Sequence, residues 1–177
     1  MIKSLAVFTL SVFSMAALAK DLTMPHKSGT LITVEKEDWE MGKDMFGIPY
    51  MYFSPKKNGQ RSNITFAATD ADISFDTTNI AGGMRDYEKM KKEWAQKTES
   101  TVQGFIPYRF WSNLYGHKIH QVGFSYKNEE KIYVEHSFYI ECKGKMYFSK
   151  SLRLEENKVH EKEFEDLIKH IDCGEGV

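Results

Sequence analysis

The chain has 177 residues, of which 28% are charged, yet its formal net charge at pH 7 is only −1. This balance excludes the basic stripe with which nucleic-acid-binding proteins contact phosphates. It also argues against strong electrostatic binding to an anionic membrane surface.

The first nineteen residues have the pattern of a secretory signal peptide. A basic start at Lys3 is followed by an apolar run over 5–18, which ends in the small-residue signal 17–19, Ala-Leu-Ala. We expect cleavage after Ala19 and export to the periplasm or the extracellular space, with an uncleaved anchor as the alternative. No cysteine lies near Ala19 for lipid attachment. Residues 20–177 are then expected to form a single domain without a membrane span.

The two cysteines, Cys142 and Cys173, are the whole cysteine content of the chain. An even pair in an oxidising compartment indicates a disulfide. The alternative is a pair of buried free thiols.

Strand-like segments and turn signals alternate through the first part of the chain. Segments 31–39, 48–54 and 62–68 are rich in β-branched and aromatic residues. A polar stretch, 69–83, follows, and it is long for an internal loop. The spacing of Tyr87, Met90 and Trp94 predicts a helix over 84–97. Another strand is expected over 105–114.

Two hairpins are predicted in the second half from alternating segments at 117–127 and 131–142, followed by a strand after 145. A three-residue loop at 128–130 pairs Lys127 with Lys131 and places all the large apolar residues on one face. In the second hairpin, a three-residue loop at 143–145 pairs Cys142 with Met146. A two-residue loop is the alternative there, and it would turn Tyr147 inward.

A closing helix is predicted over 161–172. Its apolar residues recur at i, i+3, i+4 and i+7, namely Phe164, Leu167, Ile168 and Ile171. Cys173 lies just past its end, so a disulfide to Cys142 would join the helix to the sheet. The predicted fold class is therefore α+β: an antiparallel β-sheet of about six to seven strands flanked by two helices.

This element order resembles the PsbP-like superfamily, which includes photosystem accessory proteins, Mog-type proteins and DcrB-like exported bacterial proteins. The resemblance lies in the strand 61–66, the helical segment 87–94, Gly116 with the following hairpin, the turn 145–147 and the closing helix. It implies an antiparallel sheet sandwiched by helices and a binding or accessory role. It carries over no functional residue, because the superfamily has no shared catalytic motif. The chain departs from the lipoprotein members by lacking a lipidation cysteine.

Among the histidines, His120 and His136 are the candidate metal ligands. The expected hairpin register places them diagonally on one sheet face, whereas His117 and His120 fall on opposite faces. Two histidines need a third ligand, which the sequence does not nominate. The alternative is a stacked or hydrogen-bonded histidine pair, and we expect neither a metal nor another cofactor.

No catalytic residue is identified. The nucleophile-elbow pattern is absent, and Ser125 and Ser137 fall on predicted strands. Asp70, Asp72 and Asp76 faintly resemble a calcium loop, but the required glycine and closing glutamate are missing. A solvated polar loop is the simpler interpretation.

Tyr133 and Tyr139 lie among charged residues on the other face of the hairpins. Together with Asp70, Asp72 and Asp76 they form a candidate surface for a protein partner, or else a second core layer under the first helix. The leading expectation is an exported, non-enzymatic binding or accessory module that acts on a protein of the cell envelope. The alternatives are a carrier of a small molecule or lipid, and a metal-dependent enzyme built on His120 and His136.

Overall fold

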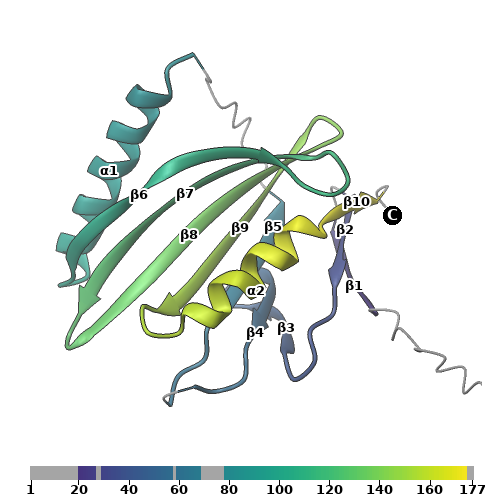
Figure 1. Ribbon diagram of the computed structural model, residues 1–177, viewed down its shortest axis with the longest axis horizontal. Helices are drawn as coiled ribbons and strands as arrows, with labels where there is room; N and C mark the ends of the chain where they lie inside the picture. The colour runs from purple at the N-terminus through teal and green to yellow at the C-terminus, as the bar shows by residue number, and fades with distance from the viewer. Residues whose placement is uncertain (1–19, 27–28, 58, 69–77, 175–177) are drawn as a thin grey trace, which may run out of the picture.

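The computed structural model describes residues 20–26, 29–57, 59–68 and 78–174 (Figure 1). The expected signal peptide lies outside the described residues. The main element is a seven-stranded antiparallel sheet in the order β3-β4-β5-β9-β8-β7-β6. Its strands are β3 (Glu40–Met45), β4 (Ile48–Phe53), β5 (Asn63–Ala68), β6 (Thr101–Ser112), β7 (Lys118–Asn128), β8 (Lys131–Cys142) and β9 (Lys145–Leu154).

A second, three-stranded sheet has the order β1-β2-β10. Its strands are β1 (Asp21–His26), β2 (Gly29–Val34) and β10 (Asp172–Gly174). β1, β3 and β10 were not expected from the sequence, and the strand predicted over 31–39 ends at Val34. The residues after Val34 turn instead, with Asp38 at a φ of 64°. The α+β class and the strand number of the large sheet agree with the prediction.

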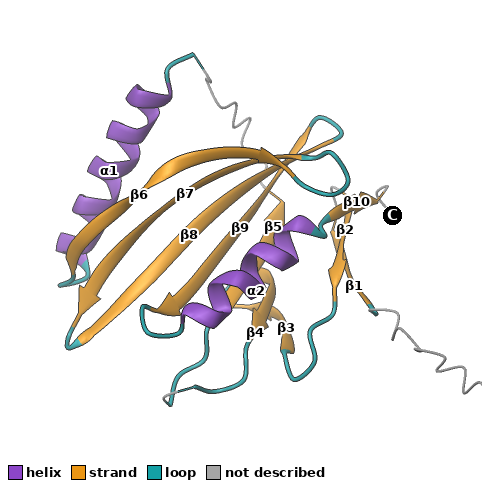
Figure 2. Ribbon diagram, in the orientation of Figure 1, coloured by secondary structure: helices purple, strands orange, loops and turns teal. Residues whose placement is uncertain are grey.

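The two helices, α1 (Ile80–Lys97) and α2 (Lys158–Lys169), cover opposite faces of the large sheet (Figure 2). On the face toward α1, Val122, Phe124 and Tyr126 pack with Tyr87 of the helix. We call this side the α1 face. On the other side, the α2 face, the core joins both sheets to α2 and includes Ile119, Phe138, Ile140, Tyr147, Phe164, Leu167 and Ile168. In the part of the chain that the structure describes, no helix is both long and apolar enough to cross a membrane.

The register predicted for the β7–β8 hairpin is wrong by one residue. Asn128 pairs with Lys131, so only Glu129 and Glu130 form the connection, and Phe124 faces Glu135 rather than Val134. A one-residue slip in register moves every side chain of one strand to the opposite sheet face relative to the paired strand. The prediction assumed one apolar face, whereas helices bury apolar side chains on both.

The β8–β9 hairpin takes the alternative two-residue loop. Cys142 pairs with Lys145, and Lys143 and Gly144 form the turn with φ angles of 48° and 78°. Two residues in the left-handed region match the twist of a tight hairpin, and glycine adopts that conformation without strain. Tyr147 is consequently buried in the α2-face core.

Both helices begin earlier than predicted. α1 starts at Ile80 instead of Met84, because the Asn79 Oδ1 atom accepts a hydrogen bond from the Gly82 amide at 3.1 Å. α2 runs over Lys158–Lys169 instead of 161–172. The Asn113 side-chain amide donates to the carbonyls of Ile168 and Ile171, at 3.4 and 2.6 Å, and so holds the end of α2.

Cys142 and Cys173 lie at disulfide distance, with Cα atoms 5.9 Å apart, and are joined as a disulfide. Both are buried on the α2 face. As expected from the sequence, the bond links the end of a sheet strand to the segment after the final helix.

Candidate functional site

A cleft of about 650 Å³ lies between the first half of α1 and the α1 face of the sheet. The helix lines it with residues spaced to share one side, namely Ile80, Gly83, Met84, Tyr87 and Met90. The opposite wall consists of Tyr108 from β6, Val122 from β7 and Tyr139 from β8, while Asn79 and Asp86 complete the lining. This volume is typical of small-molecule sites.

The cleft exists because α1 packs tightly on the sheet only from Tyr87 onward, and its first turns stand away from the sheet. Trp94 meets the rings of Phe124 and Tyr126 edge-on, with centroid distances of 5.6 and 4.9 Å, and Ala95 is buried. In the first half, Gly83 has no side chain, and a Cβ atom there would find no atom within 4 Å. Met90, at the edge of the cleft, remains 53% exposed.

A buried charge cluster anchors the middle of α1. The Lys91 Nζ atom lies 2.6 Å from Glu135 Oε1, and the two side chains are only 10% and 8% exposed. Lys150 approaches the other carboxylate oxygen of Glu135 at 3.5 Å. Lys91 also lies over the Phe124 ring, 4.6 Å from its centroid. This ion-pair cluster holds α1 at a defined distance from the sheet, and this distance sets the width of the cleft.

A β-bulge in β6 directs Tyr108 toward the cleft. The pairing of β6 with β7 shifts between Ile106 and Arg109, at Pro107 and Tyr108. Proline cannot donate a ladder hydrogen bond, and bulges characteristically change the direction of a side chain. Tyr108 thereby lines the cleft and reaches His120 on the neighbouring strand.

Three side chains form a hydrogen-bonded chain beside the cleft. His120 Nε2 lies 2.7 Å from Glu141 Oε1, and His120 Nδ1 lies 2.8 Å from the Tyr108 hydroxyl. His120 is 1% exposed. A carboxylate can only accept, so Nε2 donates to Glu141, and in the neutral imidazole Nδ1 accepts from the Tyr108 hydroxyl. The order carboxylate–imidazole–hydroxyl is that of an activating relay.

The electrostatics of the site disfavour the ionised form of its tyrosines. Burial raises the pKa of Tyr108, and the charge of Glu141 raises it further. Burial likewise raises the pKa of Tyr139, with the charge of Glu135 adding to the effect. These phenols therefore keep their protons at neutral pH. The hydrogen bond with His120 orients the Tyr108 hydroxyl.

The prediction that the candidate ligands His120 and His136 share one sheet face is wrong. His120 pairs with Tyr139 on the α1 face, whereas His136 pairs with Gly123 and meets Phe138 on the α2 face. The sheet lies between them because the true register differs by one residue from the predicted one. Burial lowers the pKa of His136.

The other candidate residues have separate places. Tyr133 stacks on Tyr126 with a centroid distance of 5.3 Å, so it belongs to the packing on the α1 face. Tyr139 packs there as well and also lines the cleft. The three loop aspartates, Asp70, Asp72 and Asp76, lie outside the described residues.

Sequence reasoning missed Tyr108 and Glu141 as partners of His120. The available signal was Pro107 inside a strand-like segment, since proline within a strand often marks a bulge. The spacing of Met90 places it on the apolar side of the helix. In the structure this side of α1 lines the cleft at Met90.

Comparison with solved structures places the fold. The chain is similar to the cyanobacterial PsbP protein CyanoP of Synechocystis sp. PCC 6803, with a TM-score of 0.60 and 10% identity over 90% of this chain and 96% of that one. It is also similar to LpqN of Mycobacterium tuberculosis, described as involved in cell envelope biogenesis, with a TM-score of 0.55 and 13% identity over 94% and 98% of the two chains. The chain thus has the PsbP-like layout that its element order suggested.

No protein-family model matches the sequence, and no curated protein matches it. The likeness to these two solved structures therefore shows the fold of the chain alone.

Proposed function

We propose that the protein is an exported accessory module of the cell envelope that acts by binding, with the cleft beneath the first half of α1 as its binding site. The cleft carries the proposal: it has about 650 Å³ of space and walls of aromatic and aliphatic side chains. The involvement of LpqN in cell envelope biogenesis supports the setting. The disulfide supports an oxidising compartment.

The lining favours a small molecule with an apolar body and a cationic or hydrogen-bond-donating end. Ile80, Met84 and Val122 provide apolar contact area. Among the described lining residues, Asp86 alone is charged, and its sign favours a cation. Tyrosine rings, such as those of Tyr108 and Tyr139, also attract cations through their electron-rich faces.

An envelope protein is the second candidate occupant. Its supporting observation is the exposure of Met90 at 53% and Ile80 at 36% on the rim of the cleft. Flexible methionines suit surfaces that adapt to a partner. Such a partner would insert an apolar side chain into the same cleft.

Gly83 offers a direct test, because it lines the cleft and a Cβ atom added there would meet no atom within 4 Å. The variant Gly83→Leu should fold at least as well as wild type, since leucine is the better helix former. The matched control is Ala81→Leu, which adds a similar side chain at an exposed position of α1 that does not line the cleft. Each protein is titrated with the uncharged fluorescent probe N-phenylnaphthylamine and analysed by native mass spectrometry.

Wild type and Ala81→Leu should bind the probe, and Gly83→Leu should bind it about tenfold more weakly, which corresponds to ~1.4 kcal/mol. A co-purifying small mass lost in Gly83→Leu supports the small-molecule occupant. Loss of an envelope protein from the Gly83→Leu complex, but not from Ala81→Leu, supports the second candidate. Equal probe binding by all three proteins, with no occupant sensitive to Gly83→Leu, would overturn the proposal.

A further inference from the structure

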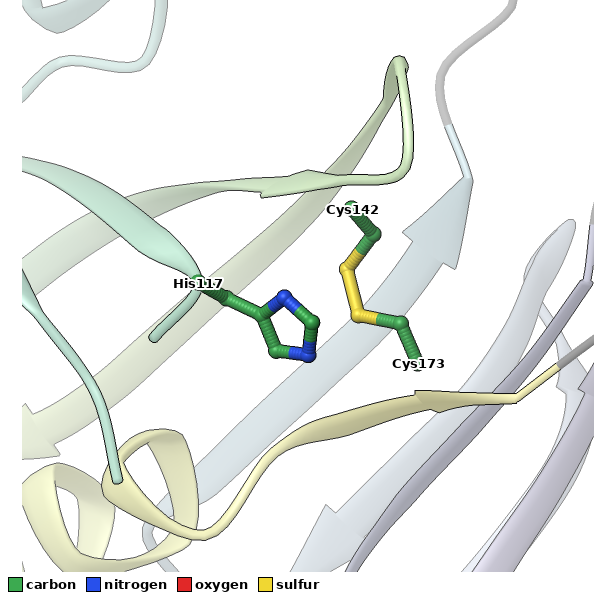
Figure 3. A group of neighbouring side chains, drawn as sticks. All are labelled: His117, Cys142 and Cys173. Atoms are coloured by element: carbon green, nitrogen blue, oxygen red, sulfur yellow. A yellow bond between two sulfur atoms is a disulfide. The ribbon is translucent and has the colours of Figure 1, made fainter. Parts of the chain in front are cut away.

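A second cluster of reactive side chains lies on the α2 face, away from the cleft. His117 precedes β7, Cys142 ends β8, and Cys173 lies in β10 (Figure 3). One ligand atom from each residue lies within 4.8 Å of the others. Figure 3 shows the imidazole ring of His117 facing the sulfur atoms of the disulfide.

Asp172 orients the imidazole of this cluster. Its Oδ1 atom lies 3.2 Å from His117 Nε2 and also accepts a hydrogen bond from the Cys173 amide at 2.8 Å. Because a carboxylate only accepts, Nε2 carries the proton and Nδ1 keeps the lone pair. Metal-binding histidines typically have this carboxylate partner on the second ring nitrogen.

The backbone around the cluster holds the three residues together independently of the S–S bond. Strand pairing places Lys118, next to His117, opposite Glu141, next to Cys142. Asn113 binds both sides of the site: its amide donates to the His117 carbonyl at 3.0 Å, and its side chain donates to the Ile171 carbonyl. β10 also pairs with β2, where Cys173 faces Leu31. Opening the disulfide therefore leaves the three side chains close to one another.

We propose that reduction of the Cys142–Cys173 disulfide converts this cluster into a binding site for Zn²⁺, with His117 as the third ligand. A dithiol reductant transfers two electrons and two protons to the disulfide, which gives two thiols while the reductant closes its own disulfide. The thiols lose those two protons as Zn²⁺ binds. Two thiolates and one imidazole are a zinc donor set that leaves a fourth position for water. Both cysteines are buried, which shields the metal–thiolate bonds from solvent.

The site goes beyond the proposed binding role, because it lies on the opposite sheet face and needs no occupant in the cleft. It would make the protein respond to the thiol–disulfide state of its compartment. In the oxidised form a disulfide joins Cys142 to Cys173, and in the reduced form the bound metal would join them.

The test uses the full-length mature protein, reduced under anaerobic conditions with dithiothreitol, desalted and titrated with Zn²⁺ alone. Co²⁺ substitution reports thiolate ligation through its charge-transfer absorption. The variants are His117→Ala, Asp172→Asn and the double substitution Cys142→Ser/Cys173→Ser. His170→Ala is the matched control, because His170 also contacts an aspartate, Asp166, but lies outside the cluster. Far-ultraviolet circular dichroism follows folding throughout.

Reduced wild type and His170→Ala should bind about one Zn²⁺ per chain, as expected for a Cys₂His site. Asp172→Asn should bind it about 10- to 100-fold more weakly, the range for loss of an orienting carboxylate. His117→Ala should lose at least as much, and the double variant should lose the Co²⁺ charge-transfer band. Oxidised glutathione should release the metal as the disulfide re-forms.

Absence of stoichiometric Zn²⁺ binding by reduced wild type would overturn the proposal, whether that protein is folded or unfolded. Wild-type affinity in His117→Ala would do so as well. Because Gly83→Leu does not touch this cluster, it should bind Zn²⁺ as wild type does, so failure at one site is distinguishable from failure at the other.

Discussion

Glu135 is a buried carboxylate in the middle of β8, and lysines from two other elements neutralise it. Lys91 reaches it from α1 at 2.6 Å, and Lys150 reaches it from β9 at 3.5 Å. Charges are rarely buried without partners, because removing an ion from water costs several kcal/mol. Each group here depends on the others, so the cluster ties the helix to a defined place on the sheet.

Replacing Lys91 with methionine should expose this dependence. Lys91→Met leaves Glu135 buried with only Lys150, at 3.5 Å, as a partner, and we expect the free energy of unfolding to fall by about 3 kcal/mol. Urea denaturation monitored by tryptophan fluorescence measures the loss, since Trp94 packs in the same interface.

Lys92→Met is the matched control for this prediction. Lys92 is on the same helix, its side chain is 61% exposed, and its ion pair with Glu88 has a 3.9 Å separation. An exposed pair of this kind contributes less than about 1 kcal/mol. If Lys91→Met proves as mild as Lys92→Met, the buried cluster does not anchor α1.

At the scale of the element, α1 packs on the sheet from Tyr87 onward, whereas its first turns lie above a cleft. Tyr87, Lys91 and Ala95 are its buried residues, whereas Ile80 and Met90 stay exposed. With little packing to hold the first turn, its local hydrogen bonds matter more. The Asn79 side chain supplies one of them by accepting from the Gly82 amide.

The variant Asn79→Ala should therefore loosen the start of α1. Loss of an N-cap side chain costs about 1 kcal/mol. Hydrogen exchange should become faster for amides in the first turn of α1 and change little in β8. Gln96→Ala, an exposed substitution near the other end of the helix, serves as control and should leave exchange in the first turn unchanged. Unaltered exchange in Asn79→Ala would contradict the capping role.

At the scale of the whole molecule, the disulfide connects parts that the sheet alone does not. Cys142 belongs to the seven-stranded sheet and Cys173 to the three-stranded one. The bond therefore links the two sheets across the end of α2 and joins cysteines that are 31 positions apart in sequence. Constraining that loop in the unfolded chain is its main expected contribution.

The double variant Cys142→Ala/Cys173→Ala should lower the free energy of unfolding by about 3 to 4 kcal/mol relative to oxidised wild type. Chemical denaturation in the presence of a metal chelator measures this difference without interference from bound cations. Reduced wild type under the same conditions should resemble the double variant. Equal stability of the variant and oxidised wild type would show that the disulfide adds no constraint.

The resemblance in layout, the α+β class and the partner of each cysteine were accessible from the sequence because they depend on local periodicity and on simple pairing. Alternating residues in β7 and β8 indicated strands, and the i, i+3, i+4 and i+7 spacing of Phe164, Leu167, Ile168 and Ile171 indicated a helix. The hairpin registers were not accessible. They depend on how many sheet faces are buried, and apolar residues in a single strand do not reveal which helix covers them.

The candidate sites depended most on tertiary structure. In the predicted register, His120 and His136 share a sheet face. The observed register differs by one residue, and His120 contacts Tyr108 and Glu141 instead. The sequence by itself determined the types of the two helices and of the longer strands, the cysteine pair and the charge balance, because these follow from local pattern and composition. Only the tertiary structure decided the cleft and the His117–Cys142–Cys173 cluster, because each is built from segments that long-range strand pairing and helix packing bring together.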